Sequence, residues 1–138
     1  MRIAPCLFAL VLAMTRTAAA AELTVTVTGA GPTGQIRGML FRDAASFDKK
    51  SDPVASFALM PRNGSVTASI ADLPPGHYAV AVFQDTNGNH RLDTNVLGIP
   101  TEPYGFSNDA AGVTGPPTFD NAKFTVGTSS AAITIRLR

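Results

Sequence analysis

The sequence predicts an all-β fold, an antiparallel seven-stranded β-sandwich with one long ordered loop. Short segments in which apolar and polar residues alternate recur along the chain, whereas the 3.6-residue periodicity of an amphipathic helix is almost absent. Turn-forming Gly, Pro and Asn residues separate these segments, as is typical of sandwiches. The chain has 138 residues, which is enough for one domain with a modest core.

The first 21 residues are predicted to be a cleaved secretory signal peptide. Arg2 supplies a positive charge, residues 4–14 are mostly apolar, and residues 18–21 are the small residues that signal peptidase requires. The apolar run is shorter than the ~20 residues of a membrane-spanning helix. We therefore expect cleavage after Ala20 or Ala21, a periplasmic or secreted protein, and no membrane span in the mature chain.

Residues 22–138 are expected to form a single domain, and their composition excludes several classes of function. Cleavage removes Arg2 and Arg16, which leaves nine Lys and Arg residues against ten Asp and Glu residues. The mature chain therefore has no basic field to hold nucleic acid. The one cysteine, Cys6, lies in the signal peptide, so no disulfide, thiolate metal site or thiol nucleophile is expected in the domain.

The first four predicted strands alternate along their length, which places their apolar residues on one face. They are LTVTVTG (23–29), GQIRGMLFRD (34–43), VASFALM (54–60) and SVTASI (65–70). The residues expected to face inward are Leu23, Val25, Val27, Ile36, Leu40, Phe57, Leu59, Val66, Ala68 and Ile70. Asn63 and Gly64 separate the last two segments and predict a tight hairpin turn.

The last three predicted strands begin with the strongest one, LPPGHYAVAVFQD (73–85). Both of its faces are apolar over residues 78–83, as a central strand requires. The other two segments are NAKFTVG (121–127) and AAITIRLR (131–138). The residues expected to share a face are Ala122, Phe124 and Val126 in the first of these and Ile133, Ile135 and Leu137 in the second.

Residues 94–118 do not show this alternation of apolar and polar residues. The segment reads TNVLGIPTEPYGFSNDAAGVTGPPT and is rich in Gly, Pro, Asn and Ser. Long connections of this kind are uncommon in compact domains and are often functional. We expect an ordered loop that packs onto the sandwich, because apolar residues are distributed through it. These residues are Val96, Leu97, Ile99, Tyr104 and Phe106.

The segment DTNGNHRLD (85–93) has oxygen-bearing side chains at the spacing of a cation-binding loop. Hard oxygen ligands favour Ca²⁺ over transition metals, and two carboxylates match its charge. The side chains stand at positions 1, 3, 5 and 9, and a backbone carbonyl stands at position 7. The candidate metal ligands are therefore Asp85, Asn87, Asn89, the carbonyl of Arg91, and Asp93, with Ca²⁺ as the candidate cofactor.

The same segment is also consistent with a metal-free turn. Asp and Asn side chains bond to their own backbone in Asx-turns, and Asn-Gly is a strong hairpin signal. The segment departs from the helical calcium loop, because His90 stands where Gly is expected and Val96 where a bidentate Glu is expected. Both interpretations stay open on the sequence alone.

Four residues of the long loop form a candidate recognition surface, namely Glu102, Tyr104, Phe106 and Asn108. The aromatic pair offers contact area, although such residues also serve to plug a loop onto a core. Glu102 with Asp109 or Asp93 would be the carboxylate pair of a hydrolase or lyase. The chain shows no convincing catalytic constellation, so a non-enzymatic role is expected.

The block LPPGHYAVAVFQDTNGNHRLDTNVLGIPTEPYGFSNDA (73–110), continued by GPPTFDNAKFTV (115–126), resembles a family of secreted bacterial proteins known only as a domain of unknown function, DUF 2141. The resemblance covers the chain from Gln35 to the C-terminus. It implies a small exported β-sandwich of the immunoglobulin-like or transthyretin-like type, distantly similar to carboxypeptidase-regulatory-like modules. It implies no activity, because none is established for the family.

We therefore expect an exported, non-enzymatic binding or structural module with an unknown ligand or protein partner. In this interpretation the loop at residues 85–93 fixes an ion and thereby anchors the longer recognition loop. The alternatives are a carboxylate-dependent hydrolase or lyase that uses the long loop, and a purely structural domain with a metal-free turn.

Overall fold

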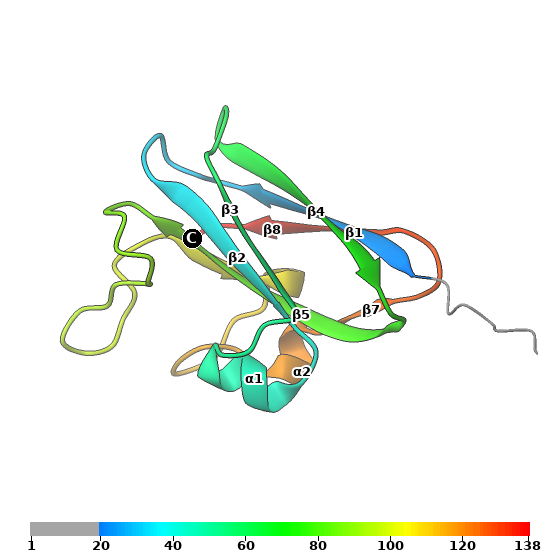
Figure 1. The fold of residues 1–138 in the computed structure, drawn as a ribbon. Coiled ribbons are helices and arrows are strands. Elements are labelled where there is room, and N and C mark those ends of the chain that lie inside the picture. Colours follow the sequence, from blue (N-terminus) through cyan, green and yellow to red (C-terminus); the bar gives the residue numbers. More distant parts are fainter. Residues whose placement is uncertain (1–19) are drawn as a thin grey trace, which may run out of the picture.

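The structure, a computed structural model, describes residues 20–138 as two β-sheets packed face to face, with two short helices below them in the view of Figure 1. Residues 1–19, and with them almost all of the predicted signal peptide, lie outside the described residues. Within residues 20–138, no helix is long and apolar enough to cross a membrane. The helices are α1 (Ala44–Lys49), α2 (Phe119–Ala122) and a 3-10 turn, Ser107–Asp109.

The strand order confirms the predicted all-β sandwich. The smaller sheet has the order β4 (Ser65–Leu73), β1 (Ala21–Thr28) and β8 (Ala131–Arg136). The larger sheet has the order β3 (Ala55–Leu59), β2 (Gln35–Phe41), β5 (Gly76–Asp85) and β6 (Tyr104–Phe106), and β7 (Phe124–Val126) pairs with the beginning of β5. All pairings between these strands are antiparallel except that of β1 with β8, which is parallel.

The prediction of seven antiparallel strands is wrong in two details. β6 is an eighth strand within residues 94–118, and its three residues are too few to show a period of two. β1 and β8 are parallel because the chain reaches β8 from β7, which belongs to the other sheet, and not through a hairpin.

The main hydrophobic core lies between the two sheets and uses the alternating faces that the sequence predicted. Its fully buried members are Leu23, Val25, Val27, Ile36, Val80, Val126 and Ile135. Phe57, Leu59 and Ile70 pack against this core and are partly buried. β5 is buried on both faces from Tyr78 to Asp85, which confirms it as the central strand.

The Asn-Gly turn is confirmed and carries the chain from one sheet to the other. Arg62 and Ser65 exchange backbone hydrogen bonds of 2.9 and 3.1 Å. Asn63 and Gly64 have φ values of +51° and +79°, the left-handed conformations of a type I′ turn. β3 and β4 therefore meet at this turn and diverge from it as the edges of the two sheets (Figure 1).

A second hydrophobic cluster covers the outer face of the larger sheet beneath α1 and α2. Phe47 lies at its centre, with ring centroids 5.7 Å from Phe41 and 5.9 Å from both Phe106 and Phe119. Neither helix was predicted, because six and four residues are too few to show a helical period in the sequence. The expectation that Ala122 lies in a strand is wrong, since this residue ends α2.

The two sheets are joined where the chain ends. The N–H of Tyr104 donates to the Arg138 carbonyl at 3.2 Å, and the N–H of Arg138 donates to the Tyr104 carbonyl at 3.0 Å. At Gly105, an added Cβ would stand 2.8 Å from Ile135 Cγ2 and 2.9 Å from the carbonyl oxygen of Arg136. The close approach of β6 and β8 therefore requires glycine at position 105.

We expect Gly105→Ala to lower the free energy of unfolding by about 1–3 kcal/mol, because the methyl group has to displace backbone. Gly127→Ala is the matched control, since nothing lies within 4 Å of a Cβ at that position. Urea unfolding followed by circular dichroism measures both variants. Equal stability of the two variants would contradict the close packing of β6 on β8.

Candidate functional site at the end of strand β5

Strand β5 ends in two buried polar residues, Gln84 and Asp85, whose side chains point to opposite faces of the sheet. Gln84 holds the turn that precedes β2. Its amide accepts from the N–H of Gly31 at 2.8 Å and donates to the carbonyls of Gly31 and Thr33 at 2.9 and 2.6 Å. Asp85 begins the loop that leads to β6, so the candidate site starts where β5 ends.

The Asp85 carboxylate is 2% exposed and accepts hydrogen bonds from two directions. From β2, Arg37 Nε donates to Oδ2 at 3.0 Å and forms an ion pair with it. From the loop, the N–H of His90 donates to Oδ2 at 3.0 Å and the N–H of Gly88 donates to Oδ1 at 2.9 Å. Burial by itself raises the pKa of Asp85, but these hydrogen bonds and the charge of Arg37 outweigh it and hold the pKa below its ordinary value.

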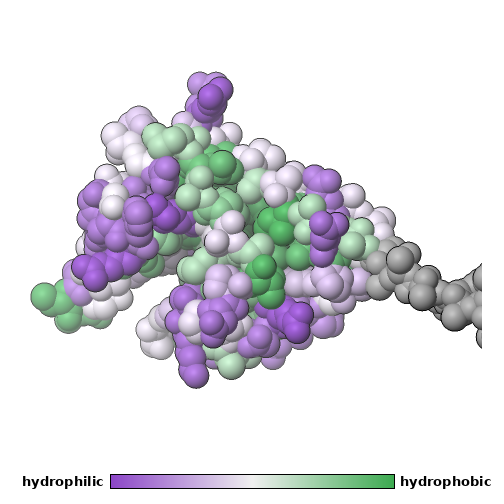
Figure 2. Space-filling model, viewed as in Figure 1, coloured by the Kyte–Doolittle hydropathy of each residue, from purple (hydrophilic) through white to green (hydrophobic). Residues whose placement is uncertain are grey.

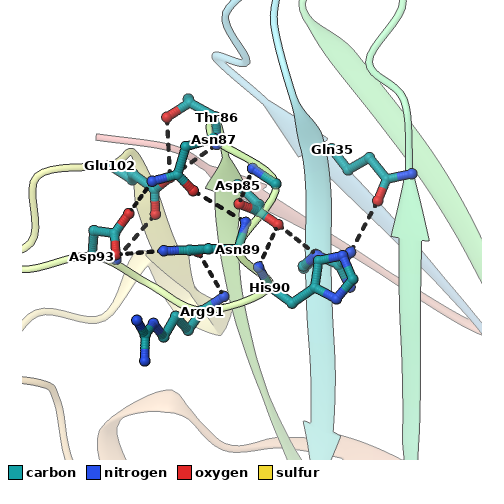
Figure 3. A network of polar contacts seen from close by, with 11 residues as sticks. Gln35, Asp85, Thr86, Asn87, Asn89, His90, Arg91, Asp93 and Glu102 are labelled. Carbon is teal, nitrogen blue, oxygen red and sulfur yellow. Dashed lines mark hydrogen bonds and ion pairs between the residues drawn. The ribbon is translucent and has the colours of Figure 1, made fainter.

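Asn87, Asn89 and Asp93 form the outer half of the loop (Figure 3). The amide of Asn89 donates to Asp93 Oδ1 at 2.7 Å, and the amide of Asn87 donates to Asp93 Oδ2. The side-chain oxygens of Asn87 and Asn89 accept from the backbone N–H groups of Asn89 and Arg91, at 3.2 and 3.1 Å. The loop therefore contains Asx-turns of the kind that the metal-free interpretation expected.

Glu102 is the second buried carboxylate of the site and closes the base of the loop. Its Oε1 accepts from the N–H and the hydroxyl of Thr86 at 2.9 and 3.0 Å, and its Oε2 accepts from the N–H of Asp93 at 3.0 Å. The side chain is 6% exposed, beneath the loop. This role was not predicted, because nothing in a single sequence links Thr86 to a residue 16 positions away.

The far end of the loop is apolar and exposed. Val96 is fully exposed, Leu97 is 78% exposed and Ile99 is 56% exposed, and they form the green tip at the lower left of Figure 2. The Asn95 side chain accepts from the N–H groups of Leu97 and Ile99 at 2.9 and 3.1 Å. The expectation that these three apolar residues pack onto the sandwich is wrong, because the turn satisfies its own backbone and carries them away from the core.

The chain returns to the core through β6 and the 3-10 turn. Tyr104 is half-buried, and Phe106 is buried in the second cluster with its ring 6.1 Å from that of Tyr104. Phe106 therefore anchors the loop to the core by packing into the second cluster, as the alternative interpretation of the aromatic pair expected. The amide of Asn108 donates to the carbonyls of Asn121 and Lys123 at 3.2 and 2.8 Å and ties the turn to α2.

The carboxylates of the loop take separate backbone partners. Asp109 accepts from the N–H of Arg136 at 2.9 Å, whereas Glu102 accepts from Thr86 and Asp93, so the two carboxylates share no hydrogen-bonding partner. Within residues 20–138, no group of three or more His, Cys, Asp or Glu side chains is arranged to hold a metal ion.

Residues 25–134 match the model of a family described as "Uncharacterized protein conserved in bacteria (DUF2141)". The chain belongs to this family. The membership expected from the central sequence block is thereby confirmed. In this DUF2141 protein the matched region contains both buried carboxylates, the polar loop and its apolar tip. Comparisons with curated proteins and with solved structures gave no match.

The charge of Asp85 is expected to make stability depend on pH. An unfolded Asp has a pKa of about 3.9, and the folded pKa of Asp85 is lower. The stabilisation from its ionised form is complete above the unfolded pKa and is lost as pH falls through the folded pKa. The difference in unfolding free energy between wild type and Asp85→Asn should therefore be largest at neutral pH and shrink below about pH 4.

Thermal and urea unfolding between pH 2 and pH 7 measure this difference. Asp48→Asn is the control, because it makes the same chemical change at an exposed side chain of α1. A gap between wild type and Asp85→Asn that stays constant over this range would contradict the role assigned to the Asp85 charge.

Proposed function

We propose that this protein is an exported, non-enzymatic binding module that recognises a partner protein through the apolar tip of the loop between β5 and β6. We call residues 86–103 the arm. The observation that carries the proposal is the contrast between the two ends of the arm. Its base is held by the buried carboxylates of Asp85 and Glu102, whereas its tip exposes Val96, Leu97 and Ile99.

An exposed apolar tip of this kind contributes nothing to the core and is typical of a protein contact. Burial of one such side chain at an interface is worth roughly 1.5–3 kcal/mol. A base that is already ordered reduces the entropy that binding has to overcome. The arm therefore combines an apolar anchor with a preorganised support, as recognition loops on rigid scaffolds do.

Export and a periplasmic or secreted location are part of the proposal. They are supported by the signal-peptide pattern of residues 1–21. The near-neutral charge of the mature chain is consistent with a protein partner and gives no support to a nucleic-acid partner.

A photoreactive benzophenone side chain placed at position 97 of the full chain should crosslink a partner protein in intact bacterial cells. The same probe at position 113 is the matched control, because Val113 is at least as exposed as Leu97 but lies outside the arm. Val96→Ser should weaken the adduct at position 97 about tenfold, since ~1.4 kcal/mol of apolar contact corresponds to that factor. Equal adducts at both positions, or none at position 97, would contradict the proposal.

A second candidate function is Ca²⁺ binding by residues 85–93. It is favoured by the meeting of Asn87, Asn89 and Asp93 on one side of the loop, where the two amide groups donate to Asp93 and would turn their oxygens toward a bound ion (Figure 3). With Asp85 and the Arg91 carbonyl they offer five protein ligands, and water would complete the six to eight oxygens that Ca²⁺ takes. Asp85 fits least well, because its carboxylate already accepts three hydrogen bonds and lies against Arg37. Asp93 is therefore the ligand on which this candidate depends.

Titration calorimetry with CaCl₂ on the purified protein tests the second candidate. A bound ion should give a measurable heat and raise the melting temperature above that in chelator, by mass action on the folded state. Asp93→Asn should abolish both effects, whereas Asp120→Asn, an exposed carboxylate in α2, should leave both unchanged. An unchanged melting temperature and no heat would contradict Ca²⁺ binding and leave the arm proposal standing.

A further inference from the structure

Strand β3 is an unprotected edge of the larger sheet. It pairs with β2 on one side, and in the part of the chain that the structure describes no strand pairs with its other side. A free edge presents a row of backbone N–H and C=O groups that can pair with another strand. Folded proteins usually protect such an edge with charged side chains, a bulge or proline.

The edge has no charged side chain between Pro53 and Pro61. Val54 and Met60, which stand at its two ends, are 42% and 60% exposed. Green residues run along this front face in Figure 2, where β3 and β4 lie in Figure 1. The two prolines lack an N–H group, so they limit any added pairing to residues 54–60.

The exposed residues along this edge are uncharged, and residues of opposite charge flank them at the two ends. Within β3 alternate residues point to the same side. The even-numbered positions from residue 52 to residue 62 are all exposed, and Asp52, with a φ of +51°, and Arg62 lie outside the strand and beyond the two prolines. In chain order they are Asp52, Val54, Ser56, Ala58, Met60 and Arg62. The series begins with a carboxylate, ends with a guanidinium, and is uncharged between them.

We propose that two copies of this protein associate through antiparallel pairing of β3 with β3, with the two-fold axis at Phe57. In this register Val54 lies opposite Met60 of the second copy, and Asp52, just outside the paired segment, lies at the same end of the contact as Arg62 of the second copy. Because the contact is isologous, each of these pairs occurs twice. Cross-strand partners stand about 4.5–5.5 Å apart at Cβ, within reach of direct contact. The two larger sheets then continue into one.

The charged ends of the edge are available for this contact. Neither Asp52 nor Arg62 forms an ion pair within the described chain, where the only two ion pairs are Arg37–Asp85 and Lys123–Asp120. A surface groove of about 320 Å³ lies beside the Met60 end and is lined by Leu59, Met60, Arg62, Ser65, Val66 and Thr67. The Val54 end of the second copy would approach this groove.

The other edges are less suited to pairing with a second copy. β6 is engaged through the backbone bonds of Tyr104 with Arg138, and the Arg136 N–H of β8 donates to Asp109. β4 carries the charged Asp72 within its span, and its pairing with β1 shifts register beside that residue; an in-strand charge and a bulge are both features that protect an edge. The edge that lacks both features is β3, and it is independent of the arm.

Sedimentation equilibrium of the purified protein over a wide concentration range tests the proposal. We expect a monomer–dimer equilibrium. Arg62→Glu should weaken the dimer about tenfold or more, because it brings like charges together at both ends of the contact. Asp52→Arg should do the same, and the double variant Asp52→Arg with Arg62→Asp should restore the wild-type dissociation constant. A monomer at all concentrations, or a dimer whose dissociation constant neither single variant changes, would overturn the proposal.

The register is tested by disulfide crosslinking, with Cys6 replaced by Ser. Protein carrying Ser56→Cys should crosslink with protein carrying Ala58→Cys, because these positions are opposite each other across the two-fold axis. Each variant alone should crosslink severalfold more slowly. Preferential crosslinking of identical positions, or the absence of mixed crosslinks in a sample that dimerises, would overturn the β3 register. Neither result bears on the arm, whose test is the photocrosslink at position 97.

Discussion

The buried Asp85 carboxylate is the constraint on which the candidate site depends. A charged group is stable at this depth only when hydrogen bonds and an opposite charge replace its lost water. Arg37 on the neighbouring strand provides one part of this environment, and the N–H groups of Gly88 and His90 provide the other. The second part exists only when the chain turns back sharply after β5. Burying this one carboxylate therefore requires the loop to fold.

Glu102 extends the same principle to the whole arm. It accepts hydrogen bonds from both sides of the arm's base, at Thr86 and at Asp93, and so closes residues 86–103 into a defined shape. The stabilising groups are concentrated at the base, and the apolar residues are concentrated at the tip. Changes at the tip are consequently expected to cost little stability, which is the usual advantage of a loop on a rigid scaffold.

The larger sheet connects the two surfaces proposed here. Arg37, which pairs with Asp85, stands in β2 directly opposite Ala58 in β3. The arm and the β3 edge thus belong to the same sheet, with the arm leaving from the end of β5 and the edge lying two strands away. Pairing of two copies through β3 would leave both arms uncovered, since they lie beyond β5 and β6 and not along the paired edge.

The sequence by itself determined the alternating strands, the central position of β5 and the Asn-Gly turn, because each follows from the residue pattern of one short segment. Only the tertiary structure decided the parallel pairing of β8, and it alone revealed strand β6 and helices α1 and α2, which are too short to produce a period. It also assigned Glu102 to the base of the arm and exposed Val96 and Leu97. Hydrophobicity alone cannot distinguish an apolar residue that anchors a loop to the core, such as Phe106, from one that the loop exposes to solvent. The difference depends on which distant segments of the chain pack against each other.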